Sequence, residues 1–262
     1  MRPGALLSLT FCYWFAPSAP SAYAWGEFAH RVIGRVAEQR LSPGVQQEVH
    51  TLLGTQTLAD VSNDADKWRE SRPETSPWHY VNIPFAATTY LHDRDCPQDN
   101  CVIAIIERYR AILTDRSRER SARKEALIFL VHFIADLHQP LHCINNNDRG
   151  GNDVAVTFFG EPDTLHSVWD FDLLAHAQLR ESAYIKRLQT MLAARNEEKL
   201  RRGTVSDWAL ESHALAKAHA YRLPPHGDIG SEYYNASIPV VDNQLAKAAV
   251  RLAWILNEAL LY

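Results

Sequence analysis

The chain has 262 residues, 46% of them hydrophobic, which is enough for one sizeable core and too little for more than two domains. Its formal net charge of −4 excludes a protein that holds nucleic acid through a generally basic surface. The charge is weaker evidence against a protein whose positive charge comes from bound metal ions.

The first 24 residues have the pattern of a cleaved secretory signal. A positively charged start precedes the apolar run 5–16, and Ala22-Tyr23-Ala24 fits the small-x-small cleavage rule. The run is shorter than the roughly 18 apolar residues of a membrane span, which disfavours an uncleaved anchor. We therefore expect residues 1–24 to be removed and Trp25 to become the new N-terminus. Residues 25–262 then form one domain of a secreted or periplasmic protein.

The rest of the chain is mainly helical in pattern. Apolar residues at a spacing of three to four, together with capping signals such as Ser42-Pro43, indicate helices. The predicted helices cover 27–40, 42–53, 58–69, 101–113, 121–139, 165–177, 181–195, 206–222 and 240–260. Residues 78–84 are expected to be extended, and 154–158 to form a short strand. The expected fold is an all-α, single-domain helical bundle with long loops and at most a small β-hairpin.

The most informative stretch is LVHFIADLHQPLH, residues 130–142. His132 and Asp136 are four residues apart and share one helix face, while Pro140 ends the helix and lets His142 return to the same space. Two imidazoles and a carboxylate are ligands that zinc accepts. In isolation, however, such a pair is more typical of buried structural histidines.

Other residues of the same types recur along the chain. His166 and Asp170 repeat the four-residue spacing, and Asp66 lies on a predicted helix with Arg69 one turn later. His30 and His79 complete a set of five histidines and three aspartates. Since no cysteine cluster accompanies this set, it favours a catalytic zinc site with open positions over a closed structural site.

The cysteines allow one disulfide in the processed chain. Cys12 leaves with the signal, and Cys96 and Cys101 flank a turn-rich loop that a disulfide can close. Cys143 directly follows His142, so it is either a metal ligand or a free thiol. A free, partly buried thiol is favoured, because thiolate zinc sites usually contain several cysteines.

The order of these motifs resembles that of a known family. Trp25, His30, WHY at 78–80, HFIADLHQPLH at 132–142, GGN at 150–152 and LHSVWD at 165–170 match the single-strand-specific, zinc-dependent nucleases of the S-one/P-one family. The resemblance covers essentially all of the processed chain. Zinc-dependent phospholipases C are similar in fold and in ligand plan.

The resemblance implies three zinc ions. The first has the ligands Asp66, His79, His132 and Asp136, and the second has His142, His166 and Asp170. The third has His30, the bridging Asp136, and Trp25 through its free α-amino group and carbonyl oxygen. Because this last site needs a new N-terminus, the resemblance implies that it forms only after signal removal.

The ligand set also implies a reaction. Two zinc ions roughly 3.5–4 Å apart can bridge one water and lower its pKa from near 16 toward 7, which produces a hydroxide that attacks phosphorus. The first and third ions share Asp136 and form that pair, while the second binds phosphate and stabilises the leaving oxygen. Arg69 matches the family's cationic position and neutralises charge on phosphorus. The alternative is a solvated arginine that pairs with Glu70 or Asp66.

Base recognition is expected around the pocket mouth. The resemblance assigns it to Gly151 and Asn152, with Tyr80 as a stacking face. Asn82 stands where the fungal pattern has aspartate, and it both donates and accepts hydrogen bonds where aspartate only accepts. The preferred base is therefore open.

The expected function is that of an exported phosphodiesterase that hydrolyses RNA and single-stranded DNA to 5′-phosphate products. The resemblance also implies 3′-nucleotidase activity. Two alternatives stay open: a zinc-dependent phospholipase C that acts on phospholipid head groups, and an exported zinc-binding protein without catalysis. Asp170 disfavours the phospholipases, which typically have glutamate there. No obligate protein partner is implied, and a monomer is expected.

Overall fold

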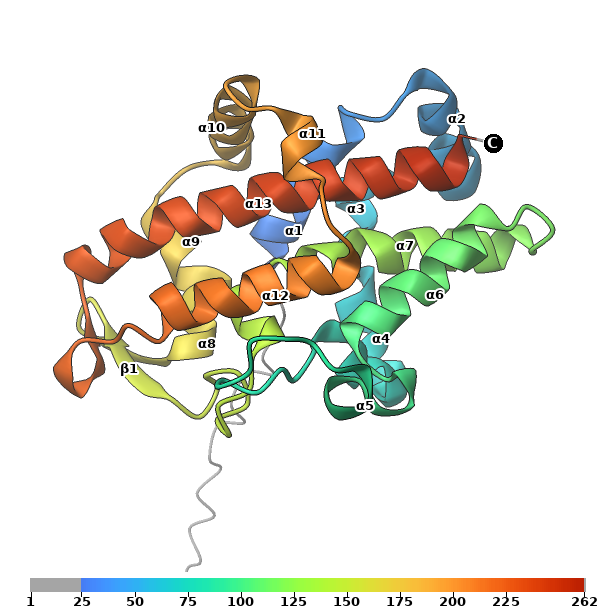
Figure 1. The fold of residues 1–262 in the computed structure, drawn as a ribbon. Helices are drawn as coiled ribbons and strands as arrows, with labels where there is room; N and C mark the ends of the chain where they lie inside the picture. Colours follow the sequence, from blue (N-terminus) through green and yellow to red (C-terminus); the bar gives the residue numbers. More distant parts are fainter. Residues whose placement is uncertain (1–24, 262) are drawn as a thin grey trace, which may run out of the picture.

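The computed structural model describes residues 25–261, and its fold is mainly helical (Figure 1). The predicted signal, residues 1–24, lies outside the described residues. The α-helices are α1 (Glu27–Glu38), α2 (Pro43–Leu53), α3 (Leu58–Val61), α4 (Asp64–Ser71), α5 (His92–Asp95), α6 (Val102–Thr114), α7 (Arg120–Leu137), α8 (Leu165–Ser167), α9 (Leu173–His176), α10 (Glu181–Ala193), α11 (Glu197–Leu200), α12 (Val205–Leu215) and α13 (Ser231–Leu260). Shorter helical turns of other types are η1 (Pro73–His79), η2 (Pro97–Asp99), η3 (Pro140–Cys143), η4 (Val168–Asp172), η5 (Ala216–Ala220) and η6 (Pro225–Gly227).

Helix α7 lies at the centre of the core. Every residue from Ala126 to Leu137 is buried, because α1, α2, α4, α6, α12 and α13 all pack against it. Figure 1 shows α13 running across the whole molecule, with α12 beside it and α10 beyond its other side. A helix that is buried on all sides must satisfy any polar side chain it carries, so His132 and Asp136 need partners in the core.

Four long predicted helices are interrupted or longer than expected. The predicted helix 58–69 is two helices, since the chain turns at Ser62 and Asn63 between α3 and α4. The last helix begins at Ser231 rather than at 240, because Pro239 is accommodated inside α13 although proline normally disfavours a helix interior. The predicted helices 165–177 and 206–222 each contain a π-type turn, η4 and η5.

The sheet is small and lies at one edge. Strands β1 (Ala155–Phe158) and β2 (Glu161–Thr164) form an antiparallel hairpin, as the sequence predicted. The hairpin gains one further strand, the two-residue β3 (Asp228–Ile229), which pairs with β1 in parallel. Because the strands are few and short and the other regular elements of the described residues are helical, the predicted all-α class is confirmed. No helix of the described part combines the length and apolar character needed to cross a bilayer.

A buried polar network ties α7 to α13. Arg251 is 4% exposed and donates from Nη1 to Nε2 of His138 (2.8 Å), from Nη2 to Glu211 (2.7 Å) and from Nε to the carbonyl oxygen of Leu200 (2.9 Å). Burial, and then the nearby Arg251 charge, hold the pKa of His138 well below its usual value. His138 is therefore neutral. Its Nδ1–H donates to the Ile134 carbonyl oxygen, and its Nε2 accepts from Arg251 of α13.

This network makes Arg251 important for stability. We expect Arg251→Met to lower the free energy of unfolding by about 3 kcal/mol or more, because the partners of a buried cation are left unpaired. Arg118→Met is the control, since Arg118 forms an exposed pair with Asp115 and its loss should change stability by less than about 0.5 kcal/mol. Urea unfolding measures both, and a loss below about 1 kcal/mol for Arg251→Met would contradict the role.

Candidate functional site

Asp136 is the centre of the first group of candidate ligands. Its Oδ2 atom lies 2.9 Å from Nδ1 of His79 and 3.1 Å from Nε2 of His132. Its Oδ1 atom lies 3.2 Å from Nε2 of His30. The carboxylate therefore contacts one imidazole from its own helix α7, one from α1 and one from the end of η1. The bridge between two metal ions that the resemblance implied for Asp136 stays a prediction.

Asp66 approaches the same imidazoles from α4. Its Oδ1 atom lies 3.7 Å from Nδ1 of His79 and 3.7 Å from Nε2 of His132. Within the described residues, His30, Asp66 and His132 form one group able to hold a metal ion, and His79, His132 and Asp136 form another. The side chains predicted for the first zinc, and His30 of the third, thus lie together.

The second group lies on η3, α8 and η4. His166 and Asp170 are one turn apart, with Nε2 of His166 3.2 Å from Oδ2 of Asp170, and Nε2 of His142 lies 3.9 Å from Oδ1. These three side chains form the third group able to hold a metal ion in the described part of the chain. Gln139 donates to Asp170 at 2.6 Å, an interaction that the sequence did not predict.

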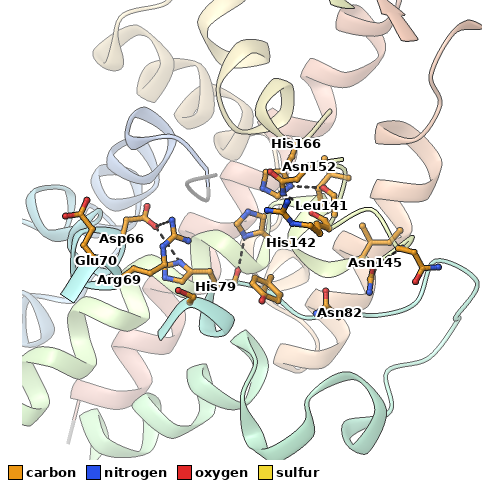
Figure 2. Close-up of a pocket in the computed structure, with 16 residues that line it drawn as sticks. Asp66, Arg69, Glu70, His79, Asn82, Leu141, His142, Asn145, Asn152 and His166 are labelled. Atoms are coloured by element: carbon orange, nitrogen blue, oxygen red, sulfur yellow. Dashed lines mark hydrogen bonds and ion pairs between the residues drawn. The ribbon is translucent and has the colours of Figure 1, made fainter. Parts of the chain in front are cut away.

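Backbone carbonyls orient three of the imidazoles. Nδ1 of His132 lies 2.7 Å from the Ser62 carbonyl oxygen, and Nδ1 of His166 lies 2.7 Å from that of Gly150. Nδ1 of His142 lies 2.9 Å from the His79 carbonyl oxygen, which joins the two groups (Figure 2). An Nδ1–H that donates to a carbonyl leaves Nε2 as a lone-pair donor facing the carboxylates, as metal-binding histidines require.

The turn at Ser62 therefore has a structural reason. If 58–69 were one continuous helix, the Ser62 carbonyl would accept a bond from within that helix. The break instead turns this carbonyl to His132. Sequence periodicity cannot detect such a break, because both halves keep helical spacing.

The electrostatics of the first group favour a cation. Burial alone would lower the pKa of His132, but the carboxylates of Asp136 and Asp66 outweigh it and raise that pKa to about 9. Burial lowers the pKa of neighbouring His79 to about 4. The pocket of carboxylates thus stabilises one positive charge among crowded imidazoles, and a divalent metal would supply it without protonating a ligand.

The residues fit a metal centre. Several of their polar atoms are buried and have no hydrogen-bond partner in the described part of the chain, although such atoms are normally paired. They are Nε2 of His30, Oδ1 of Asp66, Nε2 of His79, Oδ1 of Asp136 and Oδ2 of Asp170. Imidazole nitrogens and carboxylate oxygens in this state form the donor set that zinc binds.

The segment around Trp25 is docked against the second group. Trp25 is fully buried, and the backbone N–H of Gly26 donates to the Asp170 carbonyl oxygen at 2.9 Å. A Cβ on Gly26 would lie 2.3 Å from Cδ1 of Phe171, so only glycine fits this contact without a shift. Residue 25 is therefore held between Asp170 and the helix that carries His30.

A pocket of about 820 Å³, the main pocket, opens above these groups. Its lining includes Asp66, Arg69, Glu70, His79, Tyr80, Asn82, His142, Asn145, Asn147, Arg149, Gly150, Asn152 and His166. Figure 2 shows Glu70 and Asp66 at one end, the histidines in the middle and Asn145 at the other end. Figure 2 also shows Arg69 beside Asp66, and its Nη2 lies 3.7 Å from Oδ1 of that aspartate. Arg69 thus forms the ion pair with Asp66 that was the alternative interpretation, and it also lines the main pocket, where the resemblance placed it.

The glycine-rich loop lies beside the second group. Gly150 and Asn152 line the main pocket, whereas Gly151 is buried and donates to Asp148 at 3.1 Å. Gly150 has a φ of +61°, and a Cβ there would lie 2.5 Å from the Leu141 carbonyl oxygen. The sequence reasoning overlooked Gly150, although two adjacent glycines signalled a tight turn. It also overlooked Asn145 and Asn147, because the Asn-rich composition there predicted a loop and did not indicate that these residues line a pocket.

The cysteines behave as predicted. Cys96 and Cys101 form a disulfide, and Cys143 is a free, buried cysteine. The thiol of Cys143 donates to the Leu137 carbonyl oxygen and stands apart from the metal-binding groups.

A helical domain with buried imidazole–carboxylate groups under an open polar pocket defines the class of metal-dependent hydrolases. Comparison with known proteins gives the particular family. The profile described as S1/P1 Nuclease matches residues 25–261. Endonuclease 2 of Arabidopsis thaliana is 30% identical to this chain over 94% of it and 93% of that protein. Nuclease S1 of Aspergillus oryzae is 29% identical over 90% and 92%, and Nuclease P1 of Penicillium citrinum is 29% identical over 89% and 97%.

The chain belongs to the S1/P1 nuclease family, as its motifs predicted. It is therefore a nuclease, which hydrolyses phosphodiester bonds of nucleic acid. The family is zinc-dependent, and the three groups described above are where its metal can bind.

Thiol labelling tests the cysteine arrangement. We expect Cys143 in the native protein to resist a maleimide reagent, because the side chain is fully buried. After unfolding without reductant, one thiol per processed chain should react, and three should react after reduction. Mass spectrometry counts the adducts, and rapid labelling of the native protein would contradict the burial of Cys143.

Proposed function

We propose that the protein is an exported phosphodiesterase that hydrolyses RNA and single-stranded DNA to 5′-phosphate products with three zinc ions, and that it also removes 3′-phosphates from nucleotides. The observation that carries this proposal is the set of three buried His/Asp groups, two of which share His132. We further propose that it is a secreted or periplasmic monomer.

The proposed ligands are the nine residues that the family resemblance implied. Asp66, His79, His132 and Asp136 hold the first ion, and His142, His166 and Asp170 hold the second. His30, Asp136 and the α-amino group and carbonyl oxygen of Trp25 hold the third. This assignment is supported by the approach of three imidazoles to Asp136 and by the docking of Gly26 on Asp170. Bound zinc supplies a Lewis acid that polarises phosphate oxygens and lowers the pKa of water.

The chain's own groups position the substrate. Arg69 is held near Asp66 and can donate to the non-bridging phosphate oxygens, whose charge grows during the reaction. Asp136 and Asp66 fix the imidazoles, and buried carbonyls keep their Nε2 lone pairs directed inward. In the main pocket, metal ions held by the buried carboxylates would attract the phosphates of the polyanion.

Base contacts come from the pocket mouth. Tyr80 is 39% exposed and offers a ring face on which a base can stack. Asn82 and Asn152 also line the pocket and can both donate and accept at a base edge. Gly151 acts from behind, because its N–H holds Asp148 and so shapes the loop that presents Asn152.

The ligand assignment is tested with His132→Ala and Asp136→Asn. Each should lower kcat/KM on single-stranded DNA and RNA at least about 1000-fold, because several kcal/mol of metal-dependent stabilisation are lost. Zinc content, measured by inductively coupled plasma mass spectrometry, should fall in parallel, and a chelator should abolish wild-type activity. His50→Ala, on the exposed side of α2, is the matched control.

Substrates separate the nuclease from its rivals. The wild type should cleave both single strands faster than duplex DNA and leave phosphatidylcholine vesicles intact. Activity that survives either ligand substitution, or cleavage of lipid alone, would contradict the proposal. Zinc binding without any turnover would favour the non-catalytic alternative.

The N-terminal site is tested with Gly26→Ala. We expect about one zinc fewer per chain, because the new Cβ collides with Phe171 and displaces Trp25. Phe171 is 38% exposed, so the double variant Gly26→Ala/Phe171→Ala should regain the ion, and Phe171→Ala alone should retain it. A precursor that keeps residues 1–24 should show the same deficit. Full zinc content in both the precursor and Gly26→Ala would refute the role of the free N-terminus.

A further inference from the structure

A second groove, of about 670 Å³, lies outside the site described above. Phe85 contributes to one wall, and Lys217, Tyr221 and Arg222 come from η5 and the turn that follows it. None of these residues belongs to the three metal-binding groups, and none lines the main pocket. The second groove is therefore separate from the proposed metal centre and from the main pocket.

The groove combines cations with aromatic rings. Nζ of Lys217 lies 5.3 Å from the centroid of the Phe85 ring, and the Phe85 and Tyr221 rings meet edge to face at 5.3 Å. Among residues 25–261, neither Lys217 nor Arg222 has a salt-bridge partner. Two positive charges beside aromatic rings, in a protein with net charge −4, form a local surface suited to a polyanion with flat bases.

The second groove begins where the main pocket ends. Asn82 and Asn145 line the main pocket at the end away from Glu70 (Figure 2). Phe85 follows Asn82 by three residues, and its backbone N–H donates to the carbonyl oxygen of Asn145 at 2.9 Å. On the other wall, Tyr221 donates to Asp148 at 2.9 Å, and Asp148 in turn accepts from Gly151 of the glycine-rich loop.

These links give the two hollows a shared border. The segment 82–85 carries Asn82 of the main pocket and Phe85 of the second groove, and the loop 145–151 hydrogen-bonds to groove residues Phe85 and Tyr221. A ligand that leaves the main pocket past Asn82 therefore meets Phe85 next. Asp148, the carboxylate on this border, is buried and engaged by Tyr221, which reduces its repulsion of phosphate.

We propose that the second groove binds the part of a single-stranded nucleic acid that extends beyond the cleaved linkage. Lys217 and Arg222 contact its phosphates, and Phe85 and Tyr221 offer stacking faces to its bases. This inference rests on the proposed single-strand activity and adds a subsite to it. Because stacking and phosphate contacts are independent of base identity, the groove increases affinity for long strands of any sequence.

The test compares substrates of two lengths. The variant Lys217→Gln/Arg222→Gln keeps most of both aliphatic stems, including that of Lys217 beside Phe85, and removes both charges. We expect it to raise KM about 10-fold for a single strand of about twelve nucleotides. That length lies within the roughly 4–16 nucleotides that one single-strand-binding OB fold covers. For a dinucleotide that fills only the main pocket, KM and kcat should remain within about two-fold of the wild type.

Salt dependence gives a second readout. Each lost phosphate contact on a single strand reduces the slope of log(kcat/KM) against log salt concentration by about 0.7, so the double variant should be shallower by about 1.4 on the long strand. Arg116→Gln, in the turn between α6 and α7 at the far end of the molecule (Figure 1), is the matched loss of an exposed cation and should leave the slope unchanged.

The outcomes separate this inference from the function beneath it. An unchanged KM and slope on the long strand, or an equal increase of KM on both substrates, overturns the groove while the nuclease proposal stands. A wild-type enzyme that cleaves neither the long strand nor the dinucleotide overturns the proposed function and the groove with it.

Discussion

The structure depends on one buried carboxylate. Asp136 has no exposed surface, yet it faces imidazoles from three different parts of the chain, His30, His79 and His132. Leaving such a charge unpaired in a core is costly, so its partners must arrive from α1, η1 and α7 together. The packing of α1 and η1 on α7 and the assembly of the site therefore depend on each other.

Irregular backbone provides what regular helices cannot. The break at Ser62 frees a carbonyl for His132, the turn η3 returns His142 to the cluster, and Gly150 presents its carbonyl to His166. Asp170 lies in the π-type turn η4, a conformation that is often found at functional sites. The regular helices supply a rigid frame, and these local departures from regularity direct the side chains inward.

Sequence reasoning recovered the class of fold and grouped the metal-type side chains, because i,i+4 pairs such as His132–Asp136 and His166–Asp170 are local. The remaining convergence came from the resemblance, since no spacing rule brings His30 to Asp136 across more than a hundred residues. The break at Ser62 and the π-type turns depend on tertiary partners. The helical spacing of apolar residues continues across them, so it predicted uninterrupted helices. Pro239 led to a late start for α13, because packing along the core outweighed the usual preference of proline. Gln139 acts through its side-chain amide and Gly150 through its backbone carbonyl, on partners that lie 31 and 16 residues further along the chain, so neither contact has a local sequence signal.

The burial of Trp25 has a practical consequence for anyone who produces this enzyme. Trp25 is enclosed and Gly26 is clamped on Asp170, whereas Leu261 at the opposite terminus is 52% exposed. Affinity tags and fusion partners therefore belong after residue 262. Under the proposed removal of residues 1–24, a recombinant version that starts with an added methionine would place that extra residue directly beside the enclosed Trp25. The proposal thus favours recombinant material whose first residue is Trp25.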